Sequence, residues 1–142
     1  MRRLRKLLRA PFGFKMLLAE AFFRLLAVSI LLRLVPRTRI ELHNYGKALL
    51  AIHDVPSRGD VCKAVVIAAD YVPGATCLVR CLVARAMLAR FGFSTQIRIG
   101  VLKDSSNLQA HAWLEQRGSV LFGGDVARYS ELGNPLQVID EG

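Results

Sequence analysis

The sequence predicts an α+β fold, in which a helix that begins at Cys77 packs on a small antiparallel sheet behind a helical N-terminal segment. The chain has 142 residues, of which 53% are hydrophobic and 22% charged, enough apolar material for one packed core. Residues 77–91 are strongly helix-prone, and residues 95–122 alternate between apolar and polar positions as strands do. We therefore divide the chain into a basic, apolar helical segment over residues 1–37 and a domain over residues 38–142.

The composition narrows the class of protein. Three Cys residues are too few for a disulfide-rich secreted scaffold, so we expect free thiols in the cytoplasm. The net charge of +9 indicates an acidic partner. Residues 1–15 hold six basic residues and no acid, but no basic stripe interleaved with aromatic residues follows. Nucleic-acid binding is therefore weakly supported, and we expect none.

The N-terminal apolar stretch, residues 16–35, is predicted to be a helix that ends before Pro36. Glu20, Arg24 and Arg33 interrupt it, so its longest uncharged run is too short to cross a membrane. Residues 33–36 are also a poor cleavage site for a signal peptide. Two interpretations remain: the helix packs on the domain or on a partner protein, or it makes a peripheral contact between residues 1–35 and an anionic membrane.

Two further helices are predicted before the helix that carries the cysteine. Residues 46–53 suggest a short one, and residues 60–71 a second one with Asp60 as its N-cap. The apolar positions of the second helix form one stripe, which indicates packing on the core: Val61, Val65, Ala68 and Ala69.

The helix over residues 77–91 places a cysteine in its first turn, with Thr76 as the N-cap and Gly92 as the C-terminal stop. Unpaired N–H groups and the positive end of the helix dipole meet there, which lowers a thiol pKa and favours the nucleophilic thiolate. The same N–H groups could hold an oxyanion. Cys81, one turn deeper, and Cys62 are interpreted as small buried apolar residues.

Three predicted strands, residues 95–102, 108–115 and 119–122, form an antiparallel meander directly after this helix. His111 lies on the second strand, so a helix packed on the sheet can bring Cys77 to the imidazole, which would accept the thiol proton. The alternative is a satisfied histidine on a half-buried face. We assign no role to His43 or His53.

A third group should orient the imidazole of the histidine. Asp125, which follows the third strand, is the best candidate, ahead of Glu115 and Asn134. Cys77, Cys81 and His111 could supply three zinc ligands, but a fourth is not apparent and there is no C-x-x-C pair, so we expect no metal. No Gly-rich phosphate loop is present, so we expect no cofactor.

Taken together, these motifs and their order resemble the lasso peptide leader peptidases, the transglutaminase-like proteins of bacterial lasso peptide gene clusters, which often stand alone as the C-terminal half of a split maturation protein. The resemblance covers residues 45–125. The motifs that carry it are Thr76-Cys77-Leu78, Arg90-Phe91-Gly92-Phe93, Ile97-Arg98-Ile99-Gly100-Val101 and Ala110-His111-Ala112-Trp113-Leu114-Glu115.

The resemblance implies a papain-like cysteine peptidase that removes the leader from a ribosomally made precursor peptide. Cys77 matches the family nucleophile and His111 the family base. The family's acid usually sits on or just after the next strand, and Asp125 comes slightly later than that pattern. The implied partners are the precursor, a separate leader-binding protein and the lasso cyclase. A non-catalytic adaptor with the same fold, and acyl transfer to an amine, remain as alternatives.

Overall fold

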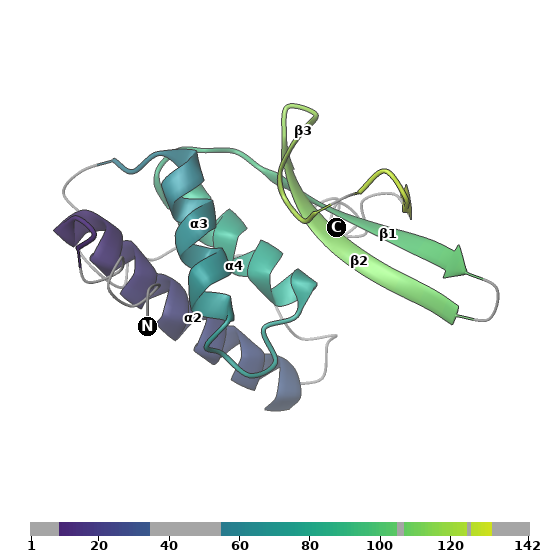
Figure 1. The fold of residues 1–142 in the computed structure, drawn as a ribbon, viewed down its shortest axis with the longest axis horizontal. Helices are drawn as coiled ribbons and strands as arrows, with labels where there is room; N and C mark the ends of the chain where they lie inside the picture. Colours follow the sequence, from purple (N-terminus) through teal and green to yellow (C-terminus); the bar gives the residue numbers. More distant parts are fainter. Residues whose placement is uncertain (1–8, 35–54, 105–106, 125, 132–142) are drawn as a thin grey trace, which may run out of the picture.

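The computed structural model describes residues 9–34, 55–104, 107–124 and 126–131. These ranges form three helices beside a four-stranded antiparallel sheet with the order β3-β2-β1-β4 (Figure 1). The helices are α2 (Phe12–Leu34), α3 (Arg58–Ala69) and α4 (Cys77–Arg90). The strands are β1 (Gln96–Asp104), β2 (Asn107–Gln116), β3 (Ser119–Phe122) and β4 (Ser130–Glu131). The predicted α+β class is confirmed.

Helix α2 packs against both α3 and α4, and its inner face joins their hydrophobic core. Leu17, Ala21 and Leu25 on this face are almost completely buried. None of the helices in the described ranges is long and apolar enough to span a membrane. The predicted helix over residues 46–53 and the predicted boundary after residue 37 lie outside the described residues.

A buried ion cluster also ties α2 to α4. The Glu20 carboxylate is fully buried and accepts a hydrogen bond from Arg24 Nε at 3.0 Å, one turn along the same helix. It also accepts from Nη1 of Arg90 at 2.5 and 2.6 Å, in the last turn of α4. Because a buried carboxylate must be paired, this cluster fixes how the two helices cross.

Helix α3 begins earlier than predicted, and the proposed N-cap was wrong. Ser57, not Asp60, caps the helix: its Oγ accepts from the Asp60 N–H at 3.1 Å, and its hydroxyl donates to Asp60 Oδ2 at 2.8 Å. The Ser57 side chain thus satisfies a free N–H of the first turn, as an N-cap does, and the cap lies three residues closer to the N-terminus than predicted. The predicted apolar stripe is confirmed, since all four of its residues are buried.

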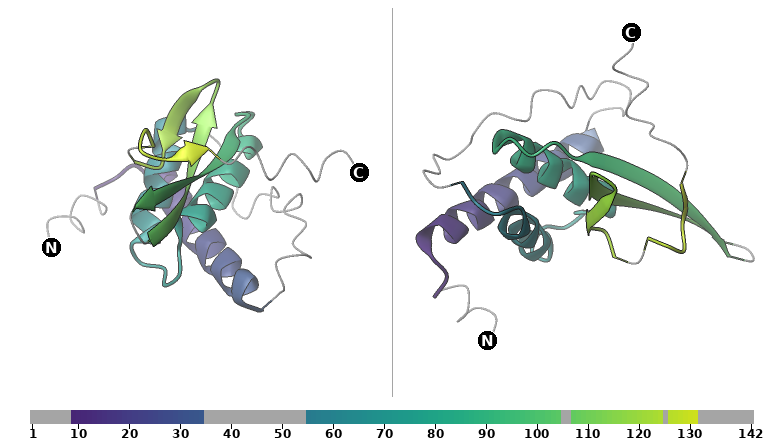
Figure 2. Two further views of the ribbon diagram at one scale, coloured as in Figure 1. Left: turned by 90° about the vertical axis from the view of Figure 1, so that its right-hand side faces the viewer. Right: turned by 90° about the horizontal axis from the view of Figure 1, so that it is seen from above.

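The sheet is a meander, as predicted, and β1 and β2 extend beyond the helices as a long ribbon (Figure 2). Ile97, Ala112 and Leu114 belong to the core that the sheet shares with the helices. The short strand β4, which pairs with β1, was not predicted. On the β3 side of β2, pairing within the described residues runs only from Leu114 to Gln116, so the rest of that edge is not covered by β3.

Candidate active site

A pocket of about 660 Å³ lies where the N-terminus of α4 meets the uncovered edge of β2. Cys77 and Arg80 line it from α4, His111 from β2, and Gly123 from the segment that follows β3. The structure therefore brings the predicted nucleophile and the predicted base to one cavity. In the described part of the chain no hydrogen bond joins the Cys77 sulfur to the imidazole, whose Nε2 is bonded to the Gly123 carbonyl.

Cys77 is the first residue of α4, and the predicted N-cap is confirmed. Thr76 Oγ1 accepts from the Val79 N–H at 3.4 Å, and the Thr76 carbonyl accepts from the Arg80 N–H at 3.0 Å. Among the described residues, the N–H groups of Cys77 and Leu78 have no acceptor. The half-exposed sulfur thus lies beside two free donors, the arrangement that can stabilise an oxyanion.

The other two cysteines are buried and unreactive in this environment. Burial raises the pKa of the Cys81 thiol to about 12 and that of the Cys62 thiol to about 11. Both sulfurs are therefore neutral near pH 7, since a group with a raised pKa keeps its proton until the pH approaches that value. This agrees with their interpretation as small apolar core residues.

His111 is oriented by a backbone group. Its Nε2 is hydrogen-bonded to the carbonyl oxygen of Gly123. Because a carbonyl can only accept, Nε2 carries the ring proton and Nδ1 is the nitrogen that can take up another. The ring also packs against Tyr129, with centroids 5.0 Å apart, and stacks on Trp113 at 6.5 Å.

Two glycines make room for this arrangement. Gly100 pairs with His111 in the β1–β2 register, and a Cβ on it would lie 2.8 Å from Cζ3 of Trp113. Gly123 has φ 137°, and a Cβ on it would lie 2.9 Å from the Trp113 Cα. Trp113 is buried, and strand alternation places it on the same face of β2 as His111.

The predicted third member of the site, Asp125, lies outside the described residues, as does the alternative Asn134. The other alternative, Glu115, is engaged elsewhere: it accepts from Trp113 Nε1 at 2.8 Å and from Arg98 Nε at 3.3 Å. Within the described residues, the partner of the second imidazole nitrogen is therefore the Gly123 carbonyl. Sequence reasoning missed it because a main-chain acceptor leaves no residue-type signal.

Arg80 also lines the pocket, a position that sequence reasoning missed. Its Nε donates to the Ala75 carbonyl at 2.9 Å, so the guanidinium lies at the first turn of α4. Helical side chains lean toward the N-terminus, and Arg80 follows Cys77 by three residues. This spacing alone predicts that the Arg80 side chain lies beside Cys77. A cation beside the positive end of a helix dipole is unfavourable for folding, and no described residue lining the pocket is acidic. The pocket therefore favours electron-rich or anionic groups.

In the described ranges, no group of three or more His, Cys, Asp or Glu side chains is arranged to hold a metal ion. Cys77 and Cys81, one helical turn apart, do not meet His111 in such a group.

A thiol at a helix N-terminus and an imidazole on an adjacent antiparallel sheet, opening on one pocket, define a class of protein suited to cysteine-dependent acyl chemistry. Comparison with protein families gives a match to the transglutaminase-like superfamily over residues 22–134. The chain belongs to this superfamily, which commonly includes cysteine peptidases and acyltransferases. The matched range includes both Cys77 and His111. No curated protein and no solved structure matches the chain.

Proposed function

We propose that this protein is a cysteine peptidase that cleaves the leader from a lasso peptide precursor. The observation that carries the chemistry is that Cys77 and His111 line one pocket, with the Gly123 carbonyl holding His111 Nε2–H and leaving Nδ1 to act as the base. The substrate class comes from the resemblance of the motifs around these residues to the leader peptidases.

In the first half of the reaction, the Cys77 thiol gives its proton to His111 Nδ1, and the sulfur attacks the carbonyl carbon at the leader–core junction. The N–H groups of Cys77 and Leu78 stabilise the resulting oxyanion. The C–N bond then breaks, and the imidazolium returns its proton to the leaving amine. The products are the core peptide with a free N-terminus and the leader held as a thioester on Cys77.

In the second half, neutral His111 takes a proton from a water molecule, which attacks the thioester carbonyl. The C–S bond breaks, the sulfur recovers the proton from His111, and the leader leaves as a carboxylic acid. The amine freed in the first half is the group that a separate cyclase would join to a side-chain carboxylate to close the macrolactam.

Recognition of the precursor is assigned to a second protein. The pocket that contains Cys77 and His111 lies at the edge of β2, and the leader has to be presented to it. We propose that a separate leader-binding protein does so, and that Arg80, the cation beside Cys77, attracts an electron-rich group of the bound peptide.

The test is mass spectrometry of the precursor after incubation with this protein and a leader-binding partner. Cys77→Ala and His111→Ala should each leave the precursor uncut, while the wild type releases leader and core. Cys62→Ala is the matched control, because it removes a thiol that is buried away from the pocket. An uncut precursor with Cys81→Ala but not with Cys77→Ala would overturn the assignment of the nucleophile.

Acyl transfer to an amine is the second candidate, since it uses the same thioester and the superfamily also includes acyltransferases. The mass of the leader product distinguishes the two reactions: a free acid results from water, and an amide results from an amine. An unmodified precursor with an unreactive Cys77 would instead indicate an adaptor that uses the fold for binding.

A further inference from the structure

Helix α2 has a second apolar face, which points away from the domain. The large side chains exposed on it are Phe12 at 76%, Phe23 at 59%, Ile30 at 47% and Leu34 at 76%. At 100° per residue these four positions fall within about 40° of one another. We call them the outer stripe; it runs along about 33 Å of helix.

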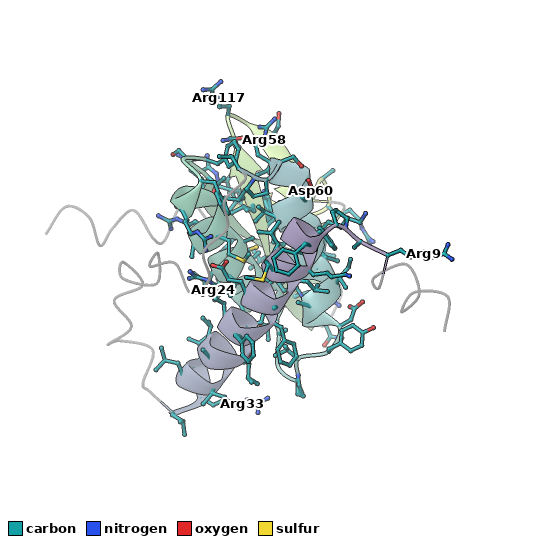
Figure 3. The ribbon with its side chains drawn as sticks, turned by 90° about the vertical axis from the view of Figure 1, so that its left-hand side faces the viewer. Arg9, Arg24, Arg33, Arg58, Asp60 and Arg117 are labelled. Atoms are coloured by element: carbon teal, nitrogen blue, oxygen red, sulfur yellow. The ribbon has the colours of Figure 1, made fainter. Side chains whose placement is uncertain are left out.

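The outer stripe lies opposite the face that packs on α3 and α4. Leu17, Ala21 and Leu25 on the inner face are buried, so α2 is apolar on both sides. A helix of this kind is normally covered all round, and large apolar side chains left exposed in a row mark an interaction surface. Figure 3 shows α2 crossing the front of the molecule, with Arg9 and Arg33 toward its two ends.

The charges around the outer stripe are basic. Lys15 and Arg33 are exposed on α2, about 60° to one side of the stripe, and Arg9 precedes the helix. The single acid of α2, Glu20, is buried in its ion cluster with Arg24 and Arg90. The outer face of α2 is therefore apolar and cationic.

We propose that the outer stripe docks α2 flat on an anionic lipid surface. Phe12, Phe23, Ile30 and Leu34 enter the boundary between headgroups and acyl chains, and the flanking cations meet lipid phosphates. A second copy of the chain is a poor occupant. Two outer stripes placed face to face would bring Lys15 and Arg33 against the same cations of the other copy, with no exposed acid on α2 to compensate.

This surface is separate from the candidate active site. None of the four outer-stripe residues lines the pocket that contains Cys77 and His111. The inference therefore does not rest on the proposed peptidase activity, and its test needs no substrate.

The experiment is co-sedimentation of the full chain with vesicles made of phosphatidylglycerol and phosphatidylcholine in equal parts, and with vesicles of phosphatidylcholine alone. We expect the chain to bind the vesicles that contain phosphatidylglycerol, and this binding should fall with added salt. Binding to vesicles of phosphatidylcholine alone should be weak. The double variant Phe23→Ser/Ile30→Ser should weaken binding about tenfold or more, because less apolar area is then buried in the lipid. Lys15→Gln should weaken it about fivefold.

Leu108→Ser is the matched control, since Leu108 is an apolar residue on β2 that is even more exposed, at 71%, and lies far from α2 in sequence. It should bind as the wild type does, and thermal unfolding of each variant checks that the fold is kept. The proposal is overturned if anionic vesicles are not bound at low salt, or if the double variant binds them as well as Leu108→Ser does. It is also overturned if the same double variant abolishes a concentration-dependent dimer in the absence of lipid, since a second copy would then be the occupant.

Discussion

Gly123 is the residue on which the orientation of His111 depends. We expect Gly123→Ala to slow precursor cleavage by about 100-fold, because its Cβ would collide with Trp113 and move the carbonyl that holds Nε2. Such a loss should appear in kcat more than in KM, and the pH profile of the rate should shift. The reason is that the substitution disturbs the proton held on Nε2 of the imidazole and leaves the substrate-binding site intact. Rates measured across a pH series check this.

Gly118→Ala is the control for backbone strain alone. Gly118 also has a positive φ, 78°, but a Cβ on it would meet nothing within 4 Å. It should cost about 1–2 kcal/mol of stability and leave the cleavage rate and its pH profile unchanged. Equal rate losses in the two glycine variants would show that destabilisation, not imidazole orientation, explains the effect at Gly123.

The three thiols should differ sharply in reactivity. With iodoacetamide at about pH 7, we expect Cys77 to be alkylated first, because it is half-exposed whereas Cys62 and Cys81 are buried. Burial also raises the pKa values of those two thiols to about 11 and about 12, so at most about one molecule in ten thousand carries either thiolate at that pH. Peptide mass spectrometry of the labelled chain gives the order. Equal, slow labelling of all three would favour the adaptor.

At the scale of elements, the crossing of α2 and α4 depends on the Glu20 carboxylate. Glu20→Leu should lower the free energy of unfolding by about 3–5 kcal/mol, because it removes the buried anion to which both Arg24 and Arg90 are bonded. Urea denaturation measures the change. Arg85→Leu, on the exposed side of α4, is the matched control and should stay within about 0.5 kcal/mol of the wild type. A similar loss in both variants would contradict the role given to Glu20.

The elements themselves were largely readable from the sequence, because each has a strong local signal. Thr76 and Gly92 bracket α4 as a cap and a stop, and alternation gave β1, β2 and β3 to within two residues. Two kinds of feature were missed. The cap of α3 is local but was assigned to Asp60 and not to Ser57, whereas strand β4 depends on a contact between distant segments. Strand β4 has two residues and exists through pairing with Gly100 and Val101, which no local pattern announces.

The candidate site likewise contains residues that the sequence could identify and groups that it could not. Cys77 and His111 could be chosen by type, by their place on an element and by motif, and the structure puts both on one pocket. The Gly123 carbonyl could not be chosen from the sequence, because every residue has a carbonyl. The direction in which this one points is set by the turn after β3. Glu20 and Arg24 were interpreted only as interruptions of an apolar helix. Their partner Arg90 lies on α4, 70 residues after Glu20, so no local pattern could reveal the cluster.

At the scale of the whole molecule, α2 is part of the same core as α3, α4 and the sheet, so the described ranges should unfold together. Leu25→Ala should therefore lower the protection of slowly exchanging amides in α4 as much as in α2, by about 2–5 kcal/mol. Native-state hydrogen exchange measures both helices in one sample. Phe23→Ala, on the outer stripe of the same helix, should change neither by more than about 0.5 kcal/mol. Faster exchange confined to α2 after Leu25→Ala would instead mean that the N-terminal helix opens independently, and the pocket beside Cys77 would then keep its structure without it.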